Sequence, residues 1–210
     1  MKNIKKTVIS VMVILIFTSV NVSATENSSE KVFPKEEINQ LLEEVHKTPI
    51  EMDSKGNLAD GEIATRSTGS YPTRKGVILV TADAYKGLIP TGHAGIIYNA
   101  FTVVESTSKG VVTGKNNWNK SKKTCYGVSV RSTTSEQDRK AADWCYNQLK
   151  KPYNYNFLNI GTRKEFYCSQ LVWAAFKDKY GIDLNTKTFG KAIHPLELVT
   201  SSKTSIIYEK

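Results

Sequence analysis

The chain has 210 residues, a length that predicts one domain with an additional segment. Its 29 Lys or Arg residues outnumber its 20 Asp or Glu residues, and its three cysteines are too few for a disulfide-built scaffold. Three of the basic residues lie in the first 24 positions, and the remainder carries 26 basic against 20 acidic residues, a net charge of +6. A positive field favours anionic surroundings such as acidic lipid or a wall polymer, but without a nucleic-acid motif or a Lys/Arg block we expect no nucleic-acid binding. A solvated, mildly basic surface is the simpler interpretation.

Residues 1–24 have the pattern of an export signal. A basic start is followed by a nearly unbroken apolar run over 8–20 and by the small residues Val22-Ser23-Ala24 at the cleavage position. The run is shorter than the roughly 20 apolar residues that span a bilayer, and no later segment approaches that length. We therefore expect a mature protein that is secreted or associated with the cell envelope, without an integral membrane segment. An uncleaved N-terminal anchor is the alternative.

Residues 25–73 are expected to form an N-terminal helix and a linker. Apolar positions recur at spacings of three and four, which predicts a helix over 35–46: Ile38, Leu41, Leu42 and Val45. Pro34 suits the start of this helix, and Glu36 and Glu37 complement the positive end of its dipole. Residues 47–73 carry few large apolar side chains. The segment is either a helix packed on the domain or a removable or inhibitory pro-segment, and the sequence leaves both open.

Residues 74–210 have the pattern of an α+β domain. Apolar runs predict strands over 77–80, 93–98, 101–105 and 126–130, with a hairpin around Asn99-Ala100. Helices are expected over 135–150, capped by Thr134 or Ser135, and over 168–179, ending at Gly181. Strands followed by interleaved helices indicate a mostly antiparallel sheet packed against helices.

Cys168 falls where a loop becomes an amphipathic helix. Backbone N–H groups at a helix start lack internal acceptors, so they favour a thiolate and could hold an oxyanion. An odd number of cysteines leaves at least one thiol unpaired, and a Cys125–Cys145 bridge is the pairing compatible with a free Cys168. Cys145 fits equally well as a small buried apolar residue of a helix. Position alone leaves a structural and a catalytic role for Cys168 open.

A reactive cysteine needs a base, and the chain has three histidines. His46 closes the N-terminal helix, where an imidazolium would complement the dipole. His194 precedes a proline in a late loop. His93 opens a strand between small residues, which allow another backbone or a substrate to come close. We therefore favour His93.

Glu105, on the next predicted strand, is the candidate for orienting the imidazole. A two-residue Asn99-Ala100 turn places Glu105 opposite Ala94, on the wrong face, whereas a three-residue loop places it opposite His93. The carboxylate therefore needs an odd loop or a bulge to reach His93. Otherwise Glu105 is a solvent-facing strand residue.

Taken in order, segments between Gly76 and Tyr208 resemble the permuted papain-like amidases of the YiiX type, in the NlpC-like superfamily of cell-wall hydrolases. The segments that carry the resemblance are Gly92-His93-Ala94-Gly95-Ile96, Val103-Val104-Glu105-Ser106, Lys151-Pro152-Tyr153-Asn154, Tyr167-Cys168-Ser169-Gln170 and His194-Pro195-Leu196-Glu197. The resemblance implies a circularly permuted papain-like fold with the nucleophile at the N-terminus of a helix. Histidine before cysteine is no objection, because triads are defined by geometry and not by chain order.

The resemblance further implies Cys168 as nucleophile, His93 as base and Glu105 as the orienting residue, with Tyr167 and Tyr153 near the substrate. It implies an amidase or peptidase that works through an acyl-enzyme, plausibly on peptidoglycan stem peptides. No cofactor is expected, and no metal-ligand spacing of Cys and His is present. The alternatives are a lipid-directed thiol acyltransferase or esterase, with loop 153–166 lining an acyl pocket, and a non-catalytic module that binds wall peptides.

Overall fold

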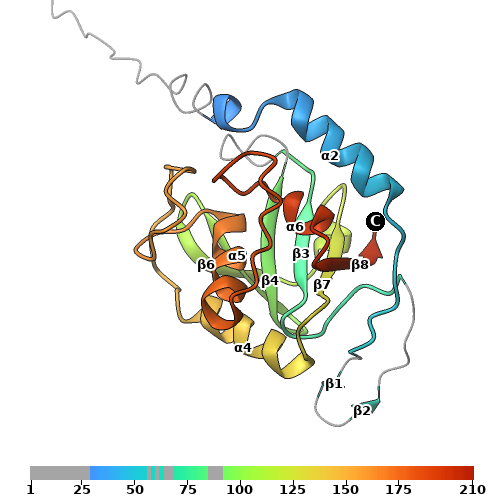
Figure 1. Cartoon of the computed structure of the whole chain (residues 1–210). Helices are drawn as coiled ribbons and strands as arrows, with labels where there is room; N and C mark the ends of the chain where they lie inside the picture. The colour runs from blue at the N-terminus through green and yellow to red at the C-terminus, as the bar shows by residue number, and fades with distance from the viewer. Residues whose placement is uncertain (1–28, 56–57, 60–61, 64–68, 85–91) are drawn as a thin grey trace, which may run out of the picture.

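The computed structural model describes residues 29–55, 58–59, 62–63, 69–84 and 92–210, and the predicted export signal lies outside these ranges. Its centre is a six-stranded antiparallel sheet with strand order β6-β5-β4-β3-β7-β8 (Figure 1). The strands are β3 (Ile78–Thr81), β4 (His93–Asn99), β5 (Thr102–Thr107), β6 (Gly110–Lys115), β7 (Tyr126–Val130) and β8 (Thr204–Glu209). A separate two-stranded sheet joins β1 (Leu58–Ala59) and β2 (Glu62–Ile63).

The central strand β3 shows why an unbroken apolar run forms a buried strand. Residues 77–80 are fully buried, and their side chains alternate between two apolar clusters. Ile78 and Val80 join the large cluster that contains the helices, whereas Val77 and Leu79 join a smaller cluster with Trp118. Both faces of the sheet are therefore covered at its centre, as the apolar run predicts.

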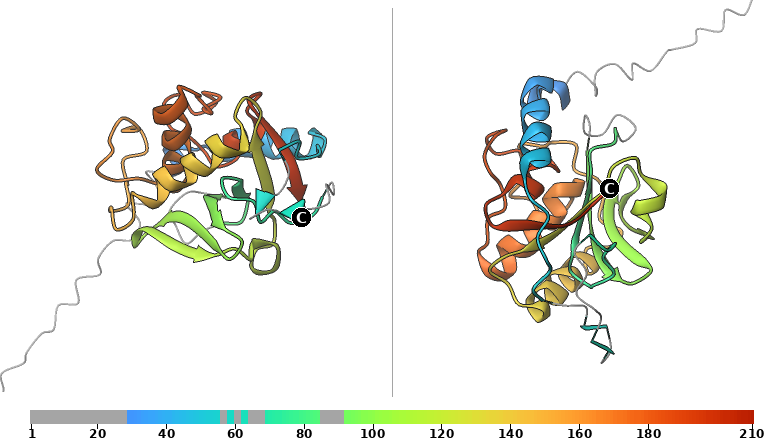
Figure 2. Two further views of the ribbon diagram at one scale, coloured as in Figure 1. Left: turned by 90° about the horizontal axis from the view of Figure 1, so that it is seen from below. Right: turned by 90° about the vertical axis from the view of Figure 1, so that its right-hand side faces the viewer.

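Two helices pack against the sheet, and Figure 2 shows them on the same side of it: α4 (Ser135–Tyr146) and α5 (Cys168–Tyr180). Thr134 caps α4 through a reciprocal pair of hydrogen bonds with Gln137. Gly181 ends α5 in the left-handed conformation (φ 69°). Both caps agree with the sequence, although α4 ends at Tyr146, four residues before its predicted end. The α+β class with an antiparallel sheet is confirmed.

Besides the short strands β1 and β2, four elements have no counterpart in the sequence analysis: β6, β8, α3 (Trp118–Ser121) and α6 (Glu197–Thr200). The two helices are single turns that lack a periodic apolar stripe. The two strands lie at the edges of the sheet, where only one side is paired, and their Ser, Thr and Gly residues weaken the strand pattern.

The β4–β5 hairpin differs from the predicted one. Its turn is Ala100-Phe101, with Asn99 paired to Thr102, and the predicted Asn99-Ala100 turn is wrong. The Asn99 side chain instead accepts the Phe101 N–H at 2.9 Å. A bulge between Ile97 and Asn99 shifts the register, so that Glu105 lies opposite Gly95. Because Gly95 and His93 point to the same side of β4, Glu105 lies on the same face of the sheet as His93. The bulge that the catalytic interpretation needed is therefore present.

The N-terminal segment is packed along the domain. Helix α2 (Lys35–Lys47) forms as predicted, buries Ile38, Leu41 and Val45, and contacts α6. Residues 48–55 then follow the domain surface, where the Glu51 N–H donates to the Ile206 carbonyl at 2.7 Å. The predicted division at residue 73 and any proteolytic processing stay predictions.

A buried group of charges fixes the next part of this segment. Asp138 of α4 is fully buried and accepts hydrogen bonds from Lys55 Nζ at 2.8 Å and Arg74 Nη1 at 2.7 Å. Arg74 also donates to Asp53 at 2.8 Å. Lys55 of the predicted linker and Arg74, the first residue of the predicted domain, therefore share one carboxylate of α4, which holds both side chains against that helix.

Candidate active site

Cys168 is the first residue of α5 and only 1% exposed. The Tyr167 N–H, one residue earlier, donates to the Gln170 side-chain oxygen at 3.1 Å. The N–H groups of Cys168 and Ser169 lie in the first turn, where an α-helix offers them no carbonyl acceptor. The thiol thus lies beside backbone donors and the positive end of the helix dipole, as its position in the sequence predicts.

His93 brings the thiol and a carboxylate together. It is the first residue of β4, and its Nε2 lies 2.6 Å from Glu105 Oε2 on β5. The same imidazole hydrogen-bonds to the Cys168 side chain. Helix α5 and strands β4 and β5 therefore converge on one buried cysteine–histidine–glutamate arrangement.

The imidazole in this arrangement is held protonated. Burial by itself lowers the pKa of His93, but the hydrogen bonds to Cys168 and Glu105 outweigh it and raise the pKa to about 9. The ring is consequently cationic at neutral pH. A cationic ring beside a thiol stabilises the thiolate, which is the nucleophilic form of cysteine.

Two glycines make room for side chains of β5. A Cβ atom at Gly114 on β6 would collide with Glu105 Oε1, and one at Gly95 would lie 2.6 Å from Val103 Cγ1. Any larger residue at Gly114 would push the carboxylate out of its place. Gly114 is therefore part of the candidate site, although a lone glycine in a strand gives no sequence signal of such a role.

Trp118 of α3 covers the other side of the imidazole. Its ring stacks on His93 with centroids 5.4 Å apart and an interplanar angle of 24°. It is 2% exposed, so it shields the His93–Glu105 pair from water on that side. The sequence analysis missed Trp118, and the only available signal was a lone tryptophan in a stretch rich in Asn and Lys.

Tyr153 places a buried phenol near the thiol. Its hydroxyl has no hydrogen-bond partner among the described residues. Burial raises the pKa of Tyr153 well above its usual range, and the charge of Cys168 adds to this effect, so the phenol stays neutral. A buried donor without a partner among the described residues is suited to bind a substrate oxygen.

The hydroxyl of Tyr167, by contrast, is engaged with the backbone. It accepts the Ile193 N–H at 3.1 Å and donates to the Phe157 carbonyl at 3.3 Å. These bonds tie the residue before Cys168 to loop 153–166 and to the segment before His194. They support the position of Cys168, and a direct substrate contact of Tyr167 stays a prediction.

Buried amides shape the loop between Tyr153 and α5. Asn154 donates to Gln170 Oε1 at 3.0 Å, and Gln170 Nε2 donates to the carbonyls of Asn159, Ile160 and Thr162. Sequence reasoning assigned no role to either amide, because each one acts through a partner distant in the chain.

The remaining thiols and histidines lie elsewhere. Cys125 and Cys145 are free and belong to different apolar clusters, so the alternative of a bridge between them is not realised. Burial raises the pKa of Cys125 to about 12 and that of Cys145 still further. The His194 ring packs against Phe33 and Phe189, and the backbone N–H of His194 donates to Glu197 Oε2 at 2.7 Å.

Three comparisons relate the chain to known proteins. Residues 79–204 match the family model of the permuted papain-like amidase enzymes, YaeF/YiiX, C92 family. The uncharacterized protein YycO of Bacillus subtilis (strain 168) is 31% identical over 177 residues, which cover 81% of this chain and 71% of that protein. The crystal structure of the metalloprotein YiiX from Escherichia coli O157:H7 matches with a TM-score of 0.51 at 16% identity, over 66% of this chain and 98% of that one. The sheet and helices described above thus match the papain-like fold of YiiX.

Two other kinds of feature are absent from the described ranges. Over the described ranges, no group of three or more His, Cys, Asp and Glu side chains is arranged to hold a metal ion. Nor does any helix within those ranges have the length and apolarity needed to cross a membrane.

Proposed function

The chain belongs to the permuted papain-like amidase family of YaeF and YiiX, and we propose that it is an exported cysteine hydrolase that cleaves amide or peptide bonds through an acyl-enzyme. The observation that carries this proposal is the His93 imidazole, which is hydrogen-bonded to Cys168 and lies 2.6 Å from Glu105. This arrangement supplies a nucleophile, a proton carrier and an orienting carboxylate at one buried point.

In the proposed reaction the Cys168 thiolate attacks the carbonyl carbon of the substrate. The imidazolium of His93 then gives its proton to the leaving amine, which departs and leaves a thioester on Cys168. Neutral His93 next takes a proton from water, whose oxygen attacks the thioester and releases the acid. Glu105 keeps the ring in place and stabilises its positive charge in both half-reactions.

The negative oxygen of each tetrahedral intermediate needs donors near the sulfur. The backbone N–H of Cys168 at the start of α5 is one, since the helix offers it no acceptor. The Tyr153 hydroxyl is the other, because it is buried, neutral and without a partner among the described residues. We propose these two groups as the oxyanion donors.

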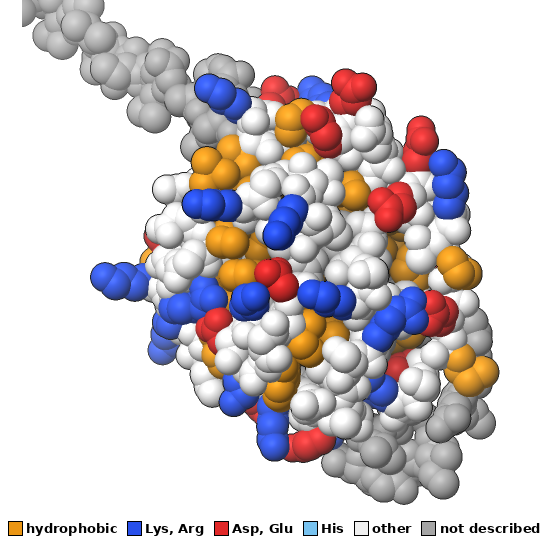
Figure 3. Space-filling view, in the orientation of Figure 1, with side chains coloured by type: hydrophobic (Ala, Val, Ile, Leu, Met, Phe, Trp, Pro, Cys, Tyr) orange, Lys and Arg blue, Asp and Glu red, His pale blue; other side chains and the backbone are white. Residues whose placement is uncertain are grey.

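The proposed substrates are the stem peptides of peptidoglycan. The expected export signal in residues 1–24 supports a location outside the cytoplasm, where such peptides occur. In Figure 3, Lys and Arg side chains run across the middle of one face with acidic side chains among them. A mixed surface of this kind suits a wall environment without requiring a dedicated polyanion site.

A second candidate is an acyltransferase or esterase that acts on lipids. It is favoured by two apolar side chains of loop 153–166, Tyr155 and Leu158, which are 54% and 55% exposed next to the residues around Cys168. Such side chains would contact an acyl chain or a lipid surface.

The experiment compares muropeptides with acyl-thioester and lipid-ester substrates, with products identified by mass spectrometry. Cys168→Ala should abolish turnover, and iodoacetamide should label only Cys168 in the natural chain, because the pKa values of Cys125 and Cys145 are raised by burial. Cys125→Ala is the matched control and should retain activity. Full activity of Cys168→Ala would overturn the nucleophile, and turnover of lipid substrates alone would favour the second candidate.

A further inference from the structure

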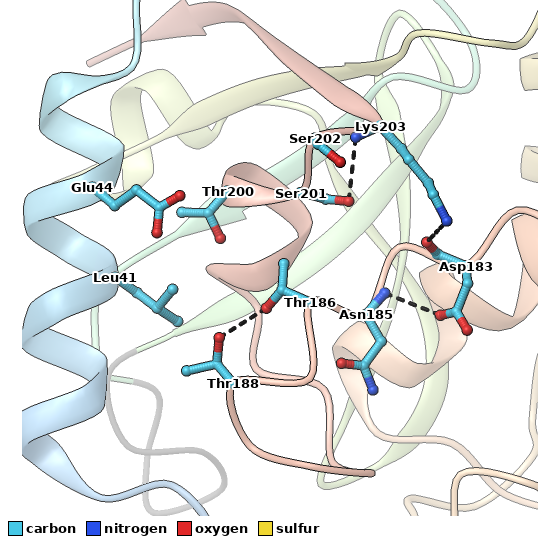
Figure 4. A pocket seen from close by; sticks show the side chains of 10 residues that line it. All are labelled: Leu41, Glu44, Asp183, Asn185, Thr186, Thr188, Thr200, Ser201, Ser202 and Lys203. Carbon is cyan, nitrogen blue, oxygen red and sulfur yellow. Dashed lines mark hydrogen bonds between the residues drawn. The ribbon is translucent and has the colours of Figure 1, made fainter.

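A pocket separate from the candidate active site lies between the N-terminal helix and the C-terminal part of the chain (Figure 4). Its walls come from α2, from residues 183–188, from the end of α6 and from the turn at 201–203. Its volume is about 420 Å³. That volume is within the range of small-molecule sites and would hold one or two sugar rings.

Hydroxyl groups dominate the lining of this pocket: Thr186, Thr188, Thr200, Ser201 and Ser202. Figure 4 shows these side chains together with the Asn185 amide around the opening. The hydroxyls of Thr186 and Thr200 already donate to Glu197 and to the Leu196 carbonyl, but their oxygens can still accept. Because a hydroxyl both donates and accepts hydrogen bonds, the lining matches a ligand that is itself rich in hydroxyls.

A buried carboxylate fixes the shape of one wall. Glu197 is fully buried, and its Oε1 accepts the Thr186 hydroxyl at 2.6 Å and the Thr188 N–H at 3.2 Å. Between them, Lys187 has a φ of 68°, in the left-handed region that few non-glycine residues occupy. Burying a carboxylate and keeping a lysine in the left-handed conformation both cost free energy. The contacts around them must offset this cost, so this wall of the pocket is pre-organised.

Charges around the pocket exclude other kinds of ligand. Glu44 and Asp183 line it and repel anions, and the Lys203 ammonium already donates to the Asp183 carbonyl at 2.8 Å. A bound metal ion is disfavoured because the described residues hold no suitable cluster of ligands. Leu41 is the one apolar residue of the lining, and it offers too little apolar surface to bind a hydrophobic ligand.

We propose that this pocket binds a saccharide, specifically an N-acetylated hexosamine of a glycan strand. The sugar hydroxyls would exchange hydrogen bonds with the Thr and Ser side chains, and the acetyl methyl group would lie against Leu41. A glycan held here would keep the protein on its polymer while the active site acts on attached peptides. That use rests on the proposed function, whereas the binding does not.

The test is an NMR titration of the mature Cys168→Ala chain, which cannot turn over substrate, with the trisaccharide of N-acetylglucosamine. The expected result is saturable shifts of the amides at Thr186, Thr188 and Ser202, with a Kd on the order of 1 mM. Ser202→Tyr fills the pocket from an exposed turn and should weaken binding at least about tenfold. Ser132→Tyr, at another exposed turn, is the matched control and should bind like the parent.

Thr188→Val provides a second variant that removes a hydroxyl without adding bulk and retains the backbone N–H bonded to Glu197. It should weaken binding as well. Absence of shifts at saturating sugar, shifts confined to other residues, or equal binding by Ser202→Tyr and Ser132→Tyr would each overturn the inference. None of these results depends on hydrolytic activity, so they leave the proposed function untouched.

Discussion

The protonated state of His93 makes a quantitative prediction about stability and pH. The pKa of His93 is raised from about 6.5 in an unfolded chain to about 9 in the folded protein. A raised pKa means that the folded state binds the proton more tightly than the unfolded state. The resulting stabilisation is fully present below about pH 6.5 and is lost as the pH rises through about 9.

The magnitude follows from the size of the shift. Each pKa unit corresponds to about 1.4 kcal/mol, so the shift of His93 contributes about 3 kcal/mol to the free energy of unfolding at low pH. The ring is fully enclosed, so solvent screening does not reduce this figure much. The variant His93→Gln keeps a polar side chain at the position but cannot titrate.

The assay is urea unfolding of the natural chain and of His93→Gln at pH 6, 7.5 and 10. Subtracting the two unfolding free energies removes the titration of groups that both proteins share. The advantage of the natural chain should fall by about 3 kcal/mol between pH 6 and pH 10. A difference that stays constant across this range would refute the protonated state of His93 and, with it, the proposed donation of a proton from the imidazolium to the leaving amine.

Two further substitutions test single contacts. Glu105→Gln removes the charge from a hydrogen bond worth roughly 1.5–3 kcal/mol, so kcat/KM should fall about tenfold to a hundredfold. The pKa of His93, followed by NMR, should decrease in this variant. An unchanged titration of His93 would contradict the orienting role of Glu105. Asp138→Asn leaves Lys55 and Arg74 without their shared counter-charge, so the free energy of unfolding measured in urea should fall by about 3–5 kcal/mol. Glu136→Gln, on the exposed side of the same helix, is the control and should lower it by less than about 0.5 kcal/mol. A loss below about 1 kcal/mol for Asp138→Asn would mean that these charges do not hold the N-terminal segment.

Much of the fold could be predicted because its signals are local. The start of α5 at Cys168, its end at Gly181 and the cap of α4 at Thr134 depend on residues within one helical turn of each other. The apolar run of β3 likewise needs no distant partner to indicate a buried strand. The choice of His93 also came from its immediate neighbours, since small residues on both sides mark a place of close approach.

The details of the site depended on contacts between distant parts of the chain. Glu105 reaches His93 only because a bulge resets the register of β4 and β5, and register is fixed by pairing and burial across strands. Trp118 covers the imidazole from a single-turn helix that no periodic pattern marks, and Gly114 makes room from a third strand.

The sequence by itself therefore determined which residues are candidates for the chemistry, because residue type and local pattern suffice for that. Only the tertiary structure decided how they act together. The pKa of about 9 at His93 results from a balance between burial and two hydrogen bonds whose partners lie 12 and 75 residues away. Such a balance exists only after the sheet and α5 have packed, since desolvation and hydrogen bonding are properties of the assembled site.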